Sequence, residues 1–131
     1  MHRYHTSGMI GDIASATLLF APRLARLGYE ELHVVHLDQR LRPVKRTEVR
    51  GELPDAVSLP LRTLIRDALL LDAPALIMAH NHPGGSAAPS RADTIATRRL
   101  VEIAVPLGIR VIDHLIFAGD TVTSFRALGL L

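Results

Sequence analysis

The stretch "ALIMAHNHPGGSAAPSRAD", residues 75–93, decides the fold because it contains three structural signals in a row. Its first six residues form a short apolar run between turn signals, which is typical of a strand buried on both faces. Pro83, Gly84 and Gly85 then end that strand and allow an abrupt turn. Ser90, followed three residues later by Asp93, has the pattern of a helix N-terminus. The sequence therefore predicts a strand, a loop and a helix here.

Two histidines lie at the end of this predicted strand. His80 and His82 are two residues apart, so they point to the same side while the chain stays extended, and Asn81 points to the other. The carboxyl edge of such a strand is where α/β sheets bind ligands. Taken alone, a His-x-His pattern indicates a metal site only weakly, because two surface histidines bonded to water would look the same.

The loop and the helix start strengthen the metal interpretation. They return the chain so that Asp93 faces His80 and His82, although helix capping alone would also explain Ser90 and Asp93. Two His and one Asp leave zinc a fourth position for water, as in catalytic sites, whereas structural sites are closed by four ligands. A hydrolytic zinc site also needs a general base. The residues alone do not choose among the candidates Glu30, Glu31, Glu48, Glu52 and Glu102.

The rest of the chain predicts alternating helices and strands around this centre. Helices are expected over 10–27, with a break near Pro22, from Ser58 and Pro60 onward, and from Ser90 to Gly108. Strands are expected over 31–38, from Val44, over 109–117 and over 121–125. This order predicts an α/β (α+β) domain in which a mixed β-sheet is sandwiched by helices.

The amino-acid composition indicates which classes of protein the chain can belong to. With 131 residues, 48% hydrophobic and 21% charged, the chain is expected to form one globular domain with a real core. It has no cysteine, which excludes disulfides and thiolate ligands and suits a cytoplasmic location. Neither a signal peptide nor a membrane span is expected.

Basic residues concentrate between Arg40 and Arg50, and all but one of the 15 Lys and Arg residues are Arg. Such a stretch fits either a solvated edge strand or a surface that binds phosphate, and the interspersed acidic residues favour the edge strand. With so few aromatic residues, a platform for stacking single-stranded bases is not expected.

The motif "HNHPGGSAAPSRAD" resembles the H-x-H-P-x6-S-x-x-D signature of JAMM/MPN metallopeptidase domains. Together with "LGIRVIDHLIF", it is most similar to the bacterial RadC family, over roughly residues 29–126. The resemblance implies a fold similar to that of cytidine deaminases and zinc bound by His80, His82 and Asp93. It also implies that Ser90 stabilises the oxyanion and that Glu30 activates water, with the adjacent Glu31 as the alternative base.

The chain is expected to divide into an N-terminal helical segment, residues 1–28, and a JAMM/MPN domain at 29–131. Full-length RadC proteins usually carry a helix-hairpin-helix-like segment there, and residues 1–28 lack its Gly-rich hairpin, which weakens an inherited link with DNA. Asn81 departs from the Ser or Thr of many peptidase members. The leading expectation is a zinc-dependent hydrolase acting on a peptide or protein substrate.

The alternative is a catalytically silent, metal-stabilised module that binds nucleic acid or protein. An HNH nuclease is not indicated, because its residues are dispersed over a ββα unit. Asp113 and His114 either orient a ligand imidazole through a hydrogen bond or form an ordinary pair straddling a strand, with one residue on each face. His33 and His36 are expected to be strand residues rather than ligands. The oligomeric state stays open.

Overall fold

The computed structural model describes residues 12–51 and 59–131. Its helices are α2 (Ile13–Leu24), α3 (Leu61–Leu70), α4 (Arg91–Ala104) and the 3-10 helix η1 (Val105–Leu107). Its strands are β1 (Glu31–Leu37), β2 (Pro43–Arg50), β3 (Ala75–Asn81), β4 (Arg110–Ala118) and β5 (Thr121–Ser124). The expected helix start at Ser58 and the first residues of the expected 10–27 helix lie outside the described residues.

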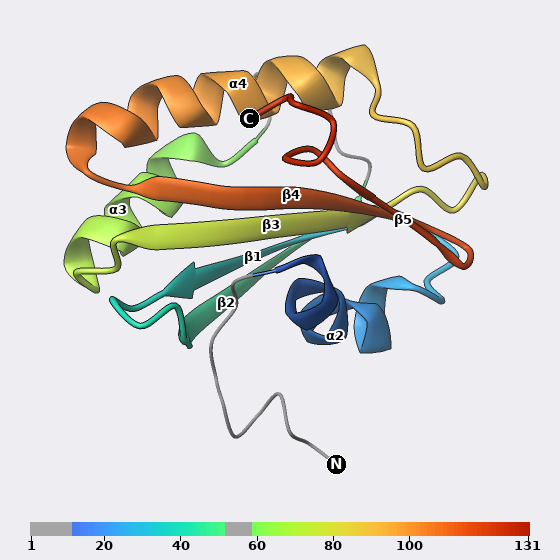
Figure 1. The fold of residues 1–131 in the computed structure, drawn as a ribbon, viewed down its shortest axis with the longest axis horizontal. Helices are drawn as coiled ribbons and strands as arrows, with labels where there is room; N and C mark the ends of the chain where they lie inside the picture. Colours follow the sequence, from blue (N-terminus) through green and yellow to red (C-terminus); the bar gives the residue numbers. More distant parts are fainter. Residues whose placement is uncertain (1–11, 52–58) are drawn as a thin grey trace.

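The strands form one mixed sheet in the order β2-β1-β3-β4-β5. β1 is antiparallel to both β2 and β3, β3 is parallel to β4, and β4 is antiparallel to β5. Helix α2 covers one face of this sheet, whereas α3 and α4 cover the other (Figure 1). The structure thus confirms the predicted mixed sheet between helices.

Each face of the sheet has its own apolar core. On the α2 face, Phe20 and Leu24 pack with strand residues such as Ile77 and Leu115. On the α3/α4 face the cluster joins the helices to β1 and β3, and it includes Leu32, Val34, Leu64, Met78 and Leu100. Because helices cover both faces, every residue of β1 and β3 is buried, which explains the continuous apolar run at the start of β3.

β2 differs from β1 and β3 because it is an edge strand, and six of its eight residues are exposed while the other two are half-buried. Its polar, Arg-rich sequence suits that position, since charged side chains discourage pairing with other strands. The structure therefore places the basic stretch on an edge strand, as its composition favours.

Helix α2 does not break at Pro22 but continues to Leu24. Pro22 lies in the last turn, so its missing N–H costs one bond at the end of the helix rather than in its middle. Phe20 and Leu24 in this helix belong to the same core as the strands, while the proposed division at residue 28 stays a prediction. Among the described residues, no helix has the length and apolar character needed to cross a membrane.

Candidate metal centre

His80 and His82 occupy the carboxyl end of β3, as predicted. The strand ends at Asn81, but the backbone N–H of His82 still donates to Phe117 O of β4 at 2.8 Å. This extra bond keeps the chain extended through His82, so both imidazoles point to the same side. Their Nε2 atoms are 2.9 Å apart.

The glycine loop after β3 fixes the orientation of His82. Gly85 has a φ of +102°, a backbone conformation that residues other than glycine rarely adopt. The turn brings Ser86 O within 2.7 Å of His82 Nδ1. Because a carbonyl oxygen can only accept, Nδ1 carries the proton and Nε2 of the neutral ring keeps its lone pair.

Asp93 reaches the two imidazoles from the first turn of α4. Its carboxylate accepts from the Ser90 N–H at 2.9 Å, while Ser90 Oγ accepts from the Asp93 N–H at 2.9 Å, which completes a capping box. The same carboxylate oxygen, Oδ2, lies 3.4 Å from His80 Nε2 and 3.2 Å from His82 Nε2. Capping and contact with the histidines are therefore not alternatives, because one side chain makes both.

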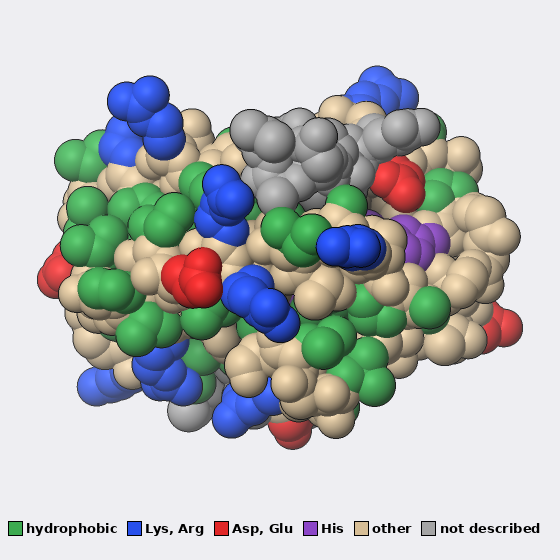
Figure 2. All heavy atoms as spheres, turned by 90° about the horizontal axis from the view of Figure 1, so that it is seen from above, with side chains coloured by type: hydrophobic (Ala, Val, Ile, Leu, Met, Phe, Trp, Pro, Cys, Tyr) green, Lys and Arg blue, Asp and Glu red, His purple; other side chains and the backbone are tan. Residues whose placement is uncertain are grey.

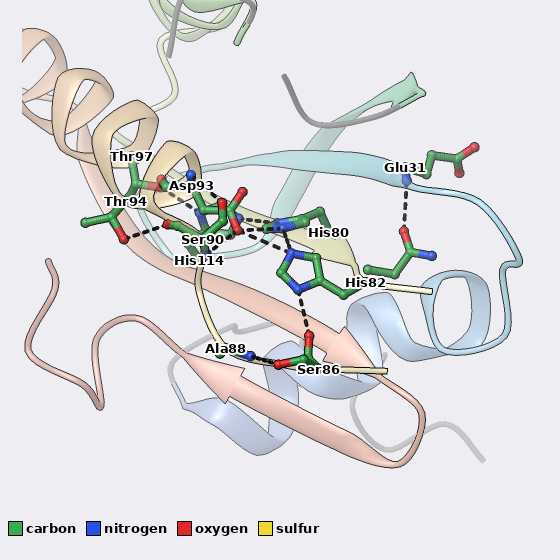
Figure 3. Close-up of polar contacts among 11 residues, drawn as sticks. Glu31, His80, His82, Ser86, Ala88, Ser90, Asp93, Thr94, Thr97 and His114 are labelled. Atoms are coloured by element: carbon green, nitrogen blue, oxygen red, sulfur yellow. Dashed lines mark hydrogen bonds and ion pairs between the residues drawn. The ribbon is translucent and has the colours of Figure 1, made fainter. Parts of the chain in front are cut away.

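These three residues converge from a strand end, a loop and a helix start (Figure 3). One candidate ligand atom of each lies within 4.8 Å of the others, so the group could hold a metal ion. The side chains of His80 and Asp93 are 1% and 3% exposed, while that of His82 is 16% exposed. Histidine correspondingly reaches the surface at one end of the face seen in Figure 2. The cluster is thus buried on one side and open to solvent on the other.

The electrostatics of the cluster favour a positive charge at its centre. Burial by itself would raise the pKa of Asp93, but the hydrogen bond and charge of a protonated His80, together with the bonds from Ser90, hold that pKa below its usual range. A carboxylate and a lone pair facing one point repel each other unless a proton or a cation lies between them. A metal cation would satisfy the same arrangement that a protonated imidazole satisfies.

The β1–β3 register assigns Glu30 and Glu31 to opposite faces of the sheet, an assignment that the sequence left open. In the β1–β3 register Leu32 pairs with His80, so the same register extended by two residues sets position 30 opposite position 82. Strand alternation then gives residue 30 the face of Leu32 and His80. Glu30 is partly buried there.

Glu31 lies on the α2 face instead. Its carboxylate contacts Arg23 at 3.1 Å and His33 at 2.7 Å, and it points away from the histidine cluster in Figure 3. Glu48 lies 3.9 Å from the same His33. Glu102 lies nine residues after Asp93 on α4, about 13 Å farther along the helix, and Glu52 lies outside the described residues.

Asn81 has a role that the sequence did not reveal. It points to the opposite side from its histidine neighbours, as alternation predicts. Its side chain accepts from the Glu31 N–H at 2.8 Å and donates to Tyr29 O at 2.8 Å and Leu27 O at 3.3 Å. Asn81 therefore fastens the segment that carries Glu30 to the strand that carries the two histidines.

Asp113 and His114 separate into two roles. His114 Nε2 lies 2.7 Å from His80 Nδ1, and its Nδ1 lies 2.7 Å from Thr97 Oγ1. Burial, followed by the positive charge of a protonated His80, lowers the pKa of His114 well below its ordinary value. Asp113 instead accepts from Ser124 Oγ and from the Arg126 N–H, so it joins β4 to β5 and the turn beyond.

Thr97 was not singled out from the sequence, where it looks like an ordinary α4 residue. Its position four residues after Asp93 is the only signal that could have drawn attention to it, since a Thr hydroxyl in a helix can bond to the carbonyl four residues earlier. It is fully buried and forms that bond to Asp93 O at 2.8 Å.

A second cluster with ligand-type atoms consists of Glu31, His33 and Glu48. Arg46 Nη1 lies 2.8 Å from His33 Nδ1, and an Arg side chain can only donate. His33 Nδ1 is therefore the acceptor, and His33 Nε2–H donates to Glu31 Oε1. Both ring nitrogens are engaged with protein partners, which agrees with the expectation that His33 is a strand residue.

The basic residues of the β2 region are also engaged within the chain. Arg42 pairs with Asp38, Lys45 with Asp67, Arg46 with His33, and the Arg50 guanidinium lies 4.2 Å from the centre of the Tyr29 ring. Figure 2 looks onto the α3/α4 side of the molecule instead, where Lys and Arg side chains are dispersed. These internal contacts weaken the interpretation of this edge as a phosphate-binding surface.

Comparisons with known proteins find one matching family model and several similar proteins. A family model described as "RadC-like JAB domain" matches residues 10–130. A UPF0758 protein of Bordetella petrii is 45% identical over 93% of this chain and 54% of its own length. A UPF0758 protein of Symbiobacterium thermophilum is 41% identical over 85% of this chain and 47% of its own. The chain therefore spans about half the length of the curated relatives it matches.

Proposed function

This chain belongs to the RadC-like JAB domain family, and from that premise we propose that it is a zinc-dependent hydrolase of peptide or isopeptide amide bonds. The observation that carries the proposal is the convergence of His80, His82 and Asp93 on one point. Two imidazoles and one carboxylate are a donor set that suits zinc.

The spacing of two of these three atom pairs matches that around a zinc ion, and the His80–His82 pair is a few tenths of an ångström shorter. Two atoms bonded to one tetrahedral zinc at about 2.0–2.1 Å lie roughly 3.3–3.4 Å from each other. The corresponding distances here are 2.9, 3.2 and 3.4 Å. What zinc supplies when bound is Lewis acidity, which acidifies water and polarises a carbonyl oxygen.

Glu30 is the proposed general base. On the β1–β3 register it shares a face with His80 and stands opposite His82. From that place its carboxylate would take a proton from the attacking water and pass it to the leaving amine. Glu31 is a poorer candidate, because Arg23 and His33 hold its carboxylate on the other face of the sheet.

Ser90 is the proposed oxyanion donor. Its Oγ accepts from the Asp93 N–H, and a hydroxyl that accepts one bond still has its own hydrogen to donate. The residue is exposed at the helix start beside the cluster, where a substrate carbonyl oxygen could reach it. Such a donor would stabilise the negative charge that develops on that oxygen.

The experiment that tests the proposal combines metal analysis with cleavage of a peptide library by wild type, Glu30→Gln and the matched control Glu31→Gln. We expect zinc in all three proteins. Cleavage should fall by about 100-fold or more in Glu30→Gln and persist in Glu31→Gln, because only the first change removes the base.

Two results would contradict this proposal. Absence of zinc from the wild type would contradict the assignment of the metal site. Unchanged cleavage in Glu30→Gln would contradict the assignment of Glu30 as the base. Zinc without any cleavage by the wild type would support the alternative, a silent metal-stabilised module that binds nucleic acid or protein. Nucleic-acid binding by such a module should weaken steeply as salt is raised.

A further inference from the structure

We propose that His114 and Thr97 are positioning residues that keep a proton on His80 Nδ1 and so leave the Nε2 lone pair of His80 free for a metal ion. This inference rests on the proposed metal site. It assigns a role to two buried residues that lie behind the three proposed ligands and come from β4 and α4.

Thr97 sets which atoms donate and which accept in the hydrogen bonds that run through His114 to His80. Its Oγ1 lies 2.8 Å from Asp93 O, and a carbonyl oxygen can only accept, so the hydroxyl uses its single hydrogen there. Toward His114 Nδ1, at 2.7 Å, the same oxygen must then accept. His114 therefore carries its proton on Nδ1.

The donor and acceptor roles at His114 then fix the position of the proton on His80. His114 is fully enclosed, with Phe125 stacked 4.4 Å from its ring centre, so its neutral ring has one N–H and presents a lone pair at Nε2. That lone pair lies 2.7 Å from His80 Nδ1, which must donate. His80 Nε2 is left with a lone pair facing His82 and Asp93.

The chain of bonds connects two of the proposed ligands to each other. It starts at the backbone carbonyl of Asp93, passes through Thr97 and His114, and ends at His80. For His82 a single backbone carbonyl, that of Ser86, has the same effect. Both imidazoles thus present Nε2 to the site, but His80 does so only because a threonine hydroxyl anchors the direction.

The opposite arrangement of protons on His114 and His80 would block metal binding. If His114 carried its proton on Nε2, it would donate to His80 Nδ1 and leave the His80 proton on Nε2. That proton would face His82 Nε2 at 2.9 Å and Asp93 Oδ2 at 3.4 Å, where it forms acceptable bonds but occupies the lone pair that a metal needs. Without the Thr97 anchor, nothing in this chain of bonds prevents the reversal.

The test compares Thr97→Val, which keeps the shape of the side chain and removes the hydroxyl, with Thr97→Ser, which keeps the hydroxyl. A third variant, His114→Phe, keeps the ring over Phe125 and removes the acceptor. Two readouts are measured on each protein. One is the position of the His80 proton in metal-free protein at alkaline pH, from long-range proton–nitrogen NMR. The other is zinc affinity, from competition with a chromophoric chelator.

We expect the His80 proton on Nδ1 in the wild type and in Thr97→Ser, and a shift toward Nε2 in Thr97→Val. Zinc affinity should fall by about 10- to 100-fold in Thr97→Val and His114→Phe and stay near the wild-type value in Thr97→Ser. Thermal unfolding of the metal-free variants shows whether a loss of affinity merely follows a loss of fold.

The inference is overturned if the wild-type His80 proton lies on Nε2, or if Thr97→Val leaves both the proton and the affinity unchanged. Equal losses in Thr97→Ser and Thr97→Val would also overturn it, because they would show that packing rather than the hydroxyl matters. A wild type that binds no zinc but holds the proton on Nδ1 would contradict the proposed function, while the proton assignment would stand.

Discussion

The two faces of the sheet each carry a cluster of histidine and carboxylate side chains, and the clusters differ in the partners of their ring nitrogens. On the α3/α4 face, His80, His82 and Asp93 direct acceptor atoms at one point. On the α2 face, His33 is held between the donor Arg46 and the acceptor Glu31, so a proton or a cationic side chain already separates each pair of acceptors. The same residue types therefore form a group that could hold a cation in one place and a closed ion-pair network in the other.

Neighbouring residues, more than ligand identity, decide whether such a cluster can take a metal. Glu31 is also paired with Arg23, whose guanidinium donates from α2 at 3.1 Å. A cation placed there would have to displace two arginines, whereas His80 and His82 are oriented by neutral partners. We therefore expect one zinc ion per chain, bound on the α3/α4 face.

The largest expected effect is on zinc affinity when one histidine is removed from each cluster. His80→Ala should lower the affinity by more than about 100-fold, because it removes a ligand, while His33→Ala should change it by less than about threefold. Chelator competition on both variants measures this. Comparable losses of affinity in the two variants would show that the clusters are not distinct in the way proposed.

An intermediate effect is expected on stability when the carboxylate on the α2 face is neutralised. The hydrogen bond from Arg23, then that from His33, lowers the pKa of Glu31 below its ordinary value, against the opposing effect of burial. A carboxyl whose pKa is lower in the folded state stabilises the fold above its unfolded pKa and loses that contribution as the pH falls. Glu31→Gln should therefore lower the free energy of unfolding by about 1–2 kcal/mol at neutral pH.

Urea denaturation of wild type and Glu31→Gln over a series of pH values checks this prediction. The difference between the two proteins should be constant near neutral pH and shrink as the pH falls below about 5, where the unfolded carboxyl begins to take up protons. A difference that grew on acidification would mean that the carboxylate is not stabilised in the folded state.

The smallest expected effect concerns Glu48, the exposed member of the second cluster. Its carboxylate lies 3.9 Å from His33 and its side chain is 47% exposed, so solvent screens the interaction. Glu48→Gln should change the free energy of unfolding by less than about 0.5 kcal/mol and leave the zinc content at one ion per chain. A lower zinc content in this variant would identify the second cluster as a metal site after all.

Local patterns predicted much of the proposed metal centre. Alternation along β3 and the capping box of α4 are short-range effects, so they placed His80, His82, Ser90 and Asp93 without knowledge of the fold. The element order was predictable for the same reason. The proline of α2 was harder to interpret, because its cost depends on its distance from the end of the helix, which the sequence does not mark.

Contacts between residues that are distant along the chain could not be predicted from the sequence. The faces of Glu30 and Glu31 became clear only from the register between β1 and β3, since a shift of one residue would exchange them. The link between His80 and Asp93 through His114 and Thr97 depends on how α4 packs against β4. The sequence near either residue does not indicate this link, because the direction of each hydrogen bond is set by partners that are distant along the chain.

The family, the mixed sheet between helices and the residues available as ligands were thus predictable from the amino-acid sequence, because they follow from local periodicity and from a motif within 19 consecutive residues. The tertiary structure alone decided which glutamate shares a face with the histidines and which cluster keeps its lone pairs open. It also decided which buried side chains orient His80. The physical reason is that proton positions and facing directions depend on atoms brought together by strand register and helix packing.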